Sequence, residues 1–94
     1  MNNKLIEFLY FIGLEESEIE ELVESCPGLK IRKFESIVRC AAAVTANGFP
    51  KSELPSLIKL NPNFLLGKPE HISQFLSHIT GDIRMELLKN PYII

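Results

Sequence analysis

The side chains with the most reactive chemistry are two histidines and the acids near them. His71 and His78 stand seven positions apart, whereas two imidazoles that bind one zinc ion from a single helix stand four apart. The sequence has no glycine-rich phosphate loop, no nucleophile elbow and no paired-cysteine motif. Catalysis would require a deep pocket that gathers several of Glu70, His71, His78 and Asp82. We therefore expect no metal site, no cofactor and no enzyme activity.

Composition and cysteine content bound the class of protein. The 94 residues are 46% hydrophobic and 23% charged, which is typical of one folded domain spanning 1–94. Cys26 and Cys40 are too few for a disulfide scaffold, and their apolar neighbours predict buried thiols in a reducing compartment. No apolar run is long enough to cross a membrane. The first residues resemble neither a secretory signal nor an organellar transit peptide, so we expect a cytoplasmic protein without membrane contact.

The basic residues are concentrated in one part of the chain. Residues 1–27 hold one base and seven acids, a net charge of −6, whereas 28–94 hold nine bases and five acids, a net charge of +4. Local patches attract a polyanion more than total charge does. Arg32 and Arg39 are seven positions apart and would share a helix face. The candidate nucleic-acid-binding residues are Lys30, Arg32, Lys33, Arg39, Lys59, Arg84 and Lys89. The alternative is that these are ordinary solvated surface charges.

An internal repeat must position these side chains. The segment GLEESEIEELVESCP, from Gly13 to Pro27, aligns with GFPKSELPSLIKLNP, from Gly48 to Pro62, at an offset of 35 residues. A shortened third copy runs from Gly81 to Pro91. Periods of 20 to 50 residues are typical of stacked helical units.

Each copy predicts a short amphipathic helix that ends at a proline. Apolar residues follow helical spacing: Leu22 aligns with Leu57, and Leu87, counted back from Pro91, aligns with Val23 and Ile58. We expect Leu22, Leu57 and Leu87 to occupy comparable places in successive layers. Ser17, Ser52 and Asp82 are the expected N-caps, with Glu20 completing a capping box after Ser17. The helices should stop before Cys26-Pro27, Asn61-Pro62 and Asn90-Pro91, since the residue before proline avoids helical backbone angles.

Longer helices are expected between the short ones. They cover 3–12, 31–47 and 69–80, with Gly48 as a C-terminal stop and Pro69 at a first helical position. The helix 3–12 is apolar nearly all round and should be covered on more than one side. The predicted core stripe of the central helix is Phe34, Ile37, Val38, Ala41, Ala42 and Thr45, and that of the third is Ile72, Phe75, Leu76 and Ile79.

The order of these elements resembles the repeat of the mitochondrial transcription termination factor (mTERF) family. The best matches are NGFPKSELPSLIKLNPNFLL and TGDIRMELLKNPYII, in which a long helix, a glycine and a short helix precede a proline followed by large apolar residues. The resemblance implies an all-α fold, a short α-solenoid of about three repeats near 3–29, 30–65 and 66–94, whose superhelical hand stays open. It also implies a basic groove that binds nucleic acid.

Two functions remain open at this point. The first is a non-catalytic mTERF-like module that contacts nucleic acid through its basic face. The second is a protein-interaction or self-associating adaptor without nucleic-acid binding. The second draws on the apolar ends: the chain ends Asn90-Pro91-Tyr92-Ile93-Ile94 with no polar capping unit, and solenoids normally cover their terminal core. A protein partner or a second copy would then cover these ends.

Overall fold

The regular structure in the described residues, 3–94, is entirely helical. The first two residues of the expected 1–94 domain lie outside this range. In the computed structural model the α-helices are α1 (Asn3–Ile12), α2 (Glu16–Ser25), α3 (Gly28–Ile31), α4 (Phe34–Ala46), α5 (Leu54–Leu60), α6 (Pro69–Ser77) and α7 (Ile83–Lys89). Three short 3-10 helices are η1 (Lys51–Glu53), η2 (Pro62–Leu66) and η3 (Pro91–Ile93). None of the helices from residue 3 onward has the length and apolar content that a bilayer crossing demands.

The prolines end the short helices, as predicted. Cys26, Asn61 and Asn90 follow the last residues of α2, α5 and α7, and each has an extended φ between −129° and −147°. The chain then makes one more helical turn, which is α3, η2 or η3. The first two of these turns insert the buried side chains of Leu29 and Phe64 into the core. The proline therefore separates the short helix from a turn that anchors it.

Two glycines end the first two long helices in the same way. Gly13 and Gly48 have φ of +121° and +106°, a region that residues with a Cβ atom rarely enter. The amide of the next residue, Leu14 or Phe49, donates to the carbonyl five positions earlier, at 3.0 and 3.3 Å. This is the hydrogen bond of a Schellman C-cap. Gly81 lacks the positive φ, and α6 already ends at Ser77.

The N-terminal caps match the prediction only in the third copy. The carboxylate of Asp82 accepts a hydrogen bond from the backbone amide three residues later, at 3.3 Å. Ser17 is already inside α2, because Glu15 is the N-cap residue and its amide donates to the Glu18 carboxylate at 2.9 Å. Ser52 is not a cap either, since it lies inside η1, which leads directly into α5. The predicted caps at Ser17 and Ser52 are wrong because a carboxylate cap and a 3-10 turn start the helical backbone earlier.

The expected helix 31–47 is divided. Arg32 and Lys33 have extended backbone with ψ of 143° and 133°, so α3 stops before them and α4 begins after them. The buried face of α4 is also rotated from the predicted stripe: Ala42 is exposed, whereas Cys40 and Val44 are buried. The reason is that α6 and η2 pack on one side of α4. In α6, likewise, Ile72 and Leu76 are buried as predicted but Phe75 is 45% exposed.

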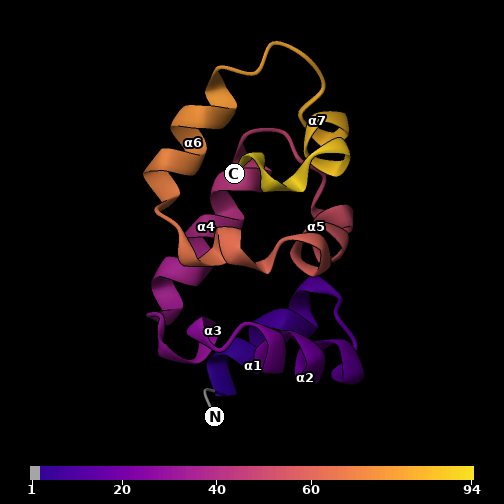
Figure 1. Ribbon diagram of the computed structural model, residues 1–94, viewed down its shortest axis with the longest axis vertical. Coiled ribbons are helices and arrows are strands. Elements are labelled where there is room, and N and C mark those ends of the chain that lie inside the picture. The colour runs from indigo at the N-terminus through magenta and orange to yellow at the C-terminus, as the bar shows by residue number, and fades with distance from the viewer. Residues whose placement is uncertain (1–2) are drawn as a thin grey trace.

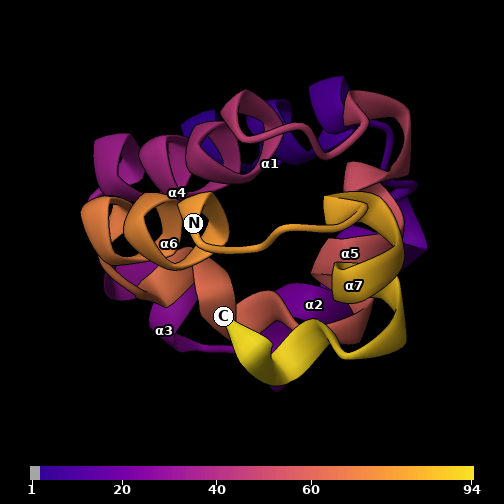
Figure 2. The ribbon, with the colours of Figure 1, turned by 90° about the horizontal axis from the view of Figure 1, so that it is seen from above.

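The described chain divides into three sequence-similar segments: segment 1 (3–29), segment 2 (30–65) and segment 3 (66–94). Each contains two helices and a turn that follows a proline. The expected alternation of long and short helices holds in segments 2 and 3 but not in segment 1, where α1 and α2 have 10 residues each. Figure 1 shows α4 and α6 on one side of the long axis, α5 and α7 on the other, and α1 to α3 at one end. The view along this axis in Figure 2 shows the same separation of α4 and α6 from α5 and α7. The molecule measures 39 × 22 × 20 Å.

One apolar core runs through all three segments. The aligned Leu22 and Leu57 are 6% and 0% exposed, and Leu87, which aligns with Ile58, is also 0% exposed, as is Ile58. The opening helix α1 is covered only in part. Its Leu5 and Leu9 are fully buried, whereas Tyr10 and Phe11 are exposed.

Candidate functional site

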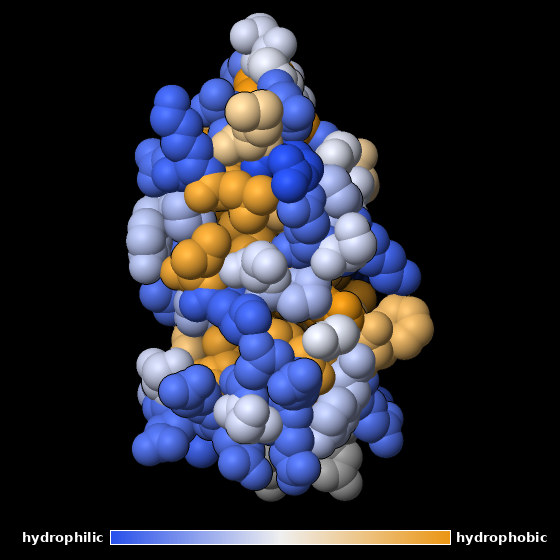
Figure 3. Space-filling view, turned by 90° about the vertical axis from the view of Figure 1, so that its right-hand side faces the viewer, coloured by the Kyte–Doolittle hydropathy of each residue, from blue (hydrophilic) through white to orange (hydrophobic). Residues whose placement is uncertain are grey.

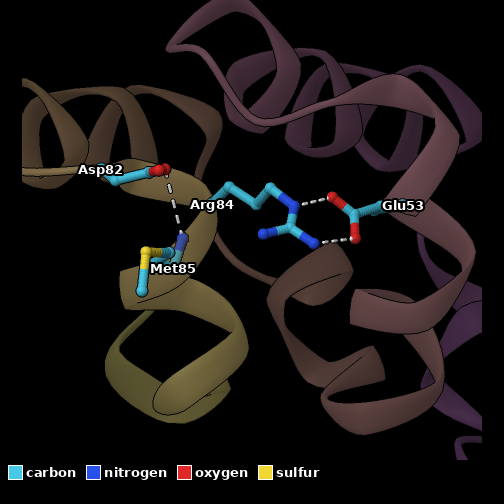
Figure 4. A network of polar contacts seen from close by, with 4 residues as sticks. All are labelled: Glu53, Asp82, Arg84 and Met85. Carbon is cyan, nitrogen blue, oxygen red and sulfur yellow. Dashed lines mark hydrogen bonds and ion pairs between the residues drawn. The ribbon is translucent and has the colours of Figure 1, made fainter.

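Two of the predicted nucleic-acid-binding bases form ion pairs between neighbouring segments. Lys59 of α5 donates to the Glu18 carboxylate of α2, with Nζ to Oε2 at 2.6 Å. Arg84 of α7 forms two hydrogen bonds with the Glu53 carboxylate, one through Nε and one from Nη2 to Oε1 at 2.7 Å (Figure 4). Glu18 and Glu53 are 35 residues apart and therefore equivalent. An equivalent carboxylate in each of the first two segments thus binds a base from the next segment.

These ion pairs change the acidity of both carboxyl groups. The hydrogen bond from Lys59 lowers the pKa of Glu18 below its ordinary value, and the hydrogen bond from Arg84 does the same for the pKa of Glu53. The same pair raises the pKa of Arg84. Both cations are partly neutralised by their partners, which weakens their attraction for a phosphate.

Arg32 is also used within the fold. Its Nη2 donates to the carbonyl of Gly67 at 2.7 Å, and the Cys40 thiol donates to the same carbonyl at 3.3 Å. Lys33 is exposed and lies with Arg32 on an open groove of about 610 Å³. The groove is also lined by Gly28 of segment 1 and Leu66 of segment 3, so residues of all three segments contribute to it. Arg32 and Lys33 are therefore the predicted bases that the structure brings together.

The remaining candidate bases lie on separate surfaces. Lys30 lines a different groove, together with glutamates of α2. Arg39 is exposed on α4, close in the helix to the exposed Glu35 and Ala42. Lys89 is exposed in the last turn of α7. The seven predicted residues thus do not gather into one basic face.

The residue before each proline also joins neighbouring segments. The buried side chain of Asn61 donates to the carbonyl of Pro91 at 2.7 Å. At the equivalent position of segment 1, the Cys26 thiol contacts the Asn63 side-chain oxygen at 3.6 Å. In segment 3 the equivalent Asn90 is exposed. In the sequence these residues were predicted only as helix ends, although their positions before aligned prolines show that they are equivalent.

The cysteines and histidines behave as separate groups. Both thiols are free and buried, as predicted, and burial raises the pKa of Cys26 and of Cys40. His71 lines a hollow between α6 and the C-terminal residues, whereas His78 lies beside the Ser77 hydroxyl at 3.3 Å. Within 3–94 no three His, Cys, Asp or Glu side chains are grouped closely enough to hold a metal ion.

A groove between α1 and α2 was not predicted from the sequence. It has a volume of about 350 Å³, and its apolar lining consists of Ile6 and Tyr10 of α1 and of Ile19 and Val23 of α2. Ile19 and Val23 are nearly buried, whereas Tyr10 is 48% exposed. The opening helix, 3–12, has more apolar residues than one buried face requires. This excess was the sequence feature that could have indicated the groove.

Comparisons with protein-family models, with curated proteins and with solved structures gave no match.

Proposed function

We propose that this chain is a short, mTERF-like α-solenoid of three repeats, 3–29, 30–65 and 66–94, that serves as a non-catalytic protein-binding module in the cytoplasm. The recurring order of two helices followed by a turn after a proline supports the architecture. So do the two ion pairs formed by Glu18 and Glu53, which occupy equivalent positions. Stacked repeats of this kind use their extended surfaces to bind other macromolecules.

The observation that carries the protein-binding function is the apolar surface left open at both ends of the stack. Tyr10 in segment 1 is 48% exposed, and Met85 and Tyr92 in segment 3 are 61% and 71% exposed. Figure 3 shows hydrophobic surface in hollows between hydrophilic side chains on the side that carries α5 and α7. Aromatic residues and methionine are enriched in protein interfaces, and contiguous apolar patches mark them.

The carboxylates support a non-catalytic module. Glu18 and Glu53 are held by bases of the following segment, and Asp82 caps α7 (Figure 4). Each of these acids therefore has a structural partner in place of a reacting group.

Nucleic-acid binding is the second candidate, and the groove at Arg32 and Lys33 favours it. This groove is open and holds two neighbouring bases with Ser36. A site with so few phosphate contacts would bind weakly and with a steep salt dependence. Lys59 and Arg84 would contribute little, because their side chains are paired with carboxylates.

Site-specific photo-crosslinking in living cells tests the proposed function. A photoreactive phenylalanine replaces Tyr10, Tyr92 or, as an exposed control on α5, Ser56. We expect discrete protein adducts from the first two positions and none from the third. The proposal is contradicted if Tyr10 and Tyr92 give no more protein adducts than Ser56.

A titration of the purified chain separates the second candidate from the first. Labelled single- and double-stranded oligonucleotides are added at low salt to the wild type and to the Lys33→Glu variant. Binding at tens of micromolar that Lys33→Glu abolishes would favour nucleic acid. No binding at that concentration would remove the second candidate.

A further inference from the structure

The groove between α1 and α2 has a counterpart inside the molecule. An offset of 35 residues carries Ile6, Tyr10 and Ile19 of segment 1 onto Ala41, Thr45 and Leu54 of segment 2. These three residues of segment 2 line a small cavity of about 220 Å³. The same surface is therefore present twice, once at the open end of segment 1 and once between segments 1 and 2.

In segment 2 the preceding long helix lies against part of this surface, and the Phe11 ring at its edge stays exposed. The side chains of Phe8, Phe11 and Ile12 from α1 line the same small cavity as Ala41 and Thr45. Their spacing of i, i+3 and i+4 is that of one helix face. The Phe8 ring also meets Phe34 of α4 edge to face, with 5.9 Å between the centroids. The occupant that this surface accepts within the molecule is thus an amphipathic helix with large apolar residues at that spacing.

The charge beside the two surfaces is opposite. The segment 2 surface carries Lys51, whose Nζ lies 4.7 Å from the Phe11 ring centroid. The equivalent position of segment 1 is Glu16. Lys59, outside the hollow on α5, pairs with Glu18 of α2, and its equivalent is Glu24. α1 therefore meets a base on segment 2, whereas a helix on segment 1 would meet acids.

The acidic rim of the segment 1 groove consists of three exposed glutamates on one edge of α2. Glu16, Glu20 and Glu24 are four residues apart and all line the groove, with Lys30 as the base among its lining residues. Like charges at this spacing repel each other, and Glu24 lies in the last turn, where the helix dipole disfavours a negative charge. This row of glutamates does not stabilise the free protein, but it would attract the positive charge of a bound partner.

A second copy of this chain is a poor occupant. In the stack, Glu18 pairs with Lys59, and Glu53 pairs with Arg84. When the copies are aligned on their prolines, Arg84 is equivalent to position 55. Positions 59 and 55 correspond to Glu24 and Glu20 of segment 1. The corresponding carboxylate of segment 3 is Asp82. Head-to-tail stacking would place Asp82 against Glu24 or Glu20, and this like-charge contact disfavours self-association.

We propose that the groove between α1 and α2 binds a basic amphipathic helix of another protein, which covers segment 1 as α1 covers segment 2. The partner helix presents large apolar residues at i, i+3 and i+4 to Ile6 and Tyr10, and lysines or arginines to Glu16, Glu20 and Glu24. This inference rests on the proposed protein-binding function and names the chemistry of the partner.

Two synthetic helical peptides test this assignment. Each has about 18 residues, long enough to form a helix when stapled, with leucines at i, i+3, i+4 and i+7. The remaining positions are lysines in one peptide and glutamates in the other. Fluorescence anisotropy with the full chain should show at least about tenfold tighter binding of the lysine peptide at about 50 mM salt, and weaker binding at about 300 mM.

Matched variants locate the binding. Glu20→Lys with Glu24→Lys should reduce affinity for the lysine peptide about tenfold or more. The variant should stay folded, because a lysine at position 20 would attract Glu16 and a lysine at position 24 would place a positive charge in the last turn of α2. Glu21→Lys is the control, because it changes the charge on the same helix outside the groove. Tyr10→Ser should weaken binding of the lysine peptide without reversing the preference between peptides.

The outcomes separate this inference from the proposed function. If the two peptides bind equally, or if Glu21→Lys acts as strongly as the double reversal, the basic-helix assignment is overturned. Protein adducts from Tyr10 would still support the proposed function in that case. A concentration-dependent dimer in light scattering that Glu20→Lys with Glu24→Lys strengthens would overturn the assignment in favour of a second copy.

Discussion

Equivalent surfaces occur at two places in this molecule, and their charges and neighbours differ. In segment 2 the surface carries Lys51 and α1 lies against it, while Lys59, outside the hollow on α5, pairs with Glu18 of α2. In segment 1 the equivalent positions are Glu16 and Glu24, and the surface is an open groove. An internal surface of a stacked array thus needs charges that match the next segment of its own chain. The groove of segment 1 is not covered by any described segment of this chain, and its charges match the basic helix proposed above.

The largest expected effect is a difference in stability between substitutions on the two sides of α1, the side that packs against segment 2 and the exposed side. Phe8→Ala should lower the free energy of unfolding by about 2 kcal/mol, because the partly buried ring loses its packing against Phe34. Tyr10→Ala, on the same helix, should cost only about 0.5 kcal/mol. Urea unfolding measures both. Equal costs would mean that both sides of α1 are covered.

The next effect concerns the two asparagines that precede Pro62 and Pro91. Asn61→Ala should cost about 1 to 2 kcal/mol, because the buried amide that donates to the Pro91 carbonyl is lost. Asn90→Ala is the matched control at the equivalent, exposed position and should change stability by less than about 0.5 kcal/mol. Thermal unfolding of the two variants decides this. If Asn90→Ala is as costly as Asn61→Ala, the two positions do not differ as the structure indicates.

A smaller effect has the opposite sign. Glu24→Lys should stabilise the free protein by about 0.5 kcal/mol, because it removes a repulsion with Glu20 and places a positive charge at the C-terminal end of α2. The gain should shrink at high salt. Chemical unfolding at two salt concentrations checks this. A loss of stability would show that Glu24 has a favourable contact in the free chain.

The smallest effect is a pH dependence of the ion pairs between segments. The folded-state pKa of Glu18 and of Glu53 lies below the ordinary value of 4.5. Their pairs therefore stabilise the fold above that value, and the contribution is lost as the pH falls through the lowered pKa. Glu53→Gln should flatten the decrease of unfolding free energy below about pH 4.5, whereas Glu21→Gln should leave it unchanged. An identical acid profile for the wild type and Glu53→Gln would contradict the pair.

The sequence predicted the helices best where backbone chemistry alone decides. Pro27 and Pro62 ended short helices, and Gly48 ended a long one, because a proline restricts its predecessor and a positive φ requires glycine. The N-caps were harder to predict. A serine and a glutamate can both cap a helix, and only the backbone path showed that Glu15 does so in α2 in place of Ser17.

The candidate site could not be predicted from local pattern, because it depends on which segment faces which. Lys59 and Arg84 looked like free bases in the sequence, but the stack sets them against Glu18 and Glu53. Ala42 looked like a core residue from helical spacing, yet it is exposed because α6 and η2 pack on another side of α4. The alignment of Glu18 with Glu53 was visible in the sequence, but not the direction in which either side chain reaches.

The most direct test of the covered and open surfaces is a set of nuclear Overhauser effects in the free, isotopically labelled protein. We predict effects between the Phe8 and Phe34 rings and between the Phe11 ring and the Lys51 side chain. The Tyr10 ring should show effects only to segment 1 and Lys30 in the free chain, with new intermolecular effects once the lysine peptide is added. Missing Phe8–Phe34 effects, or effects that link Tyr10 to residues 31–94, would contradict the account.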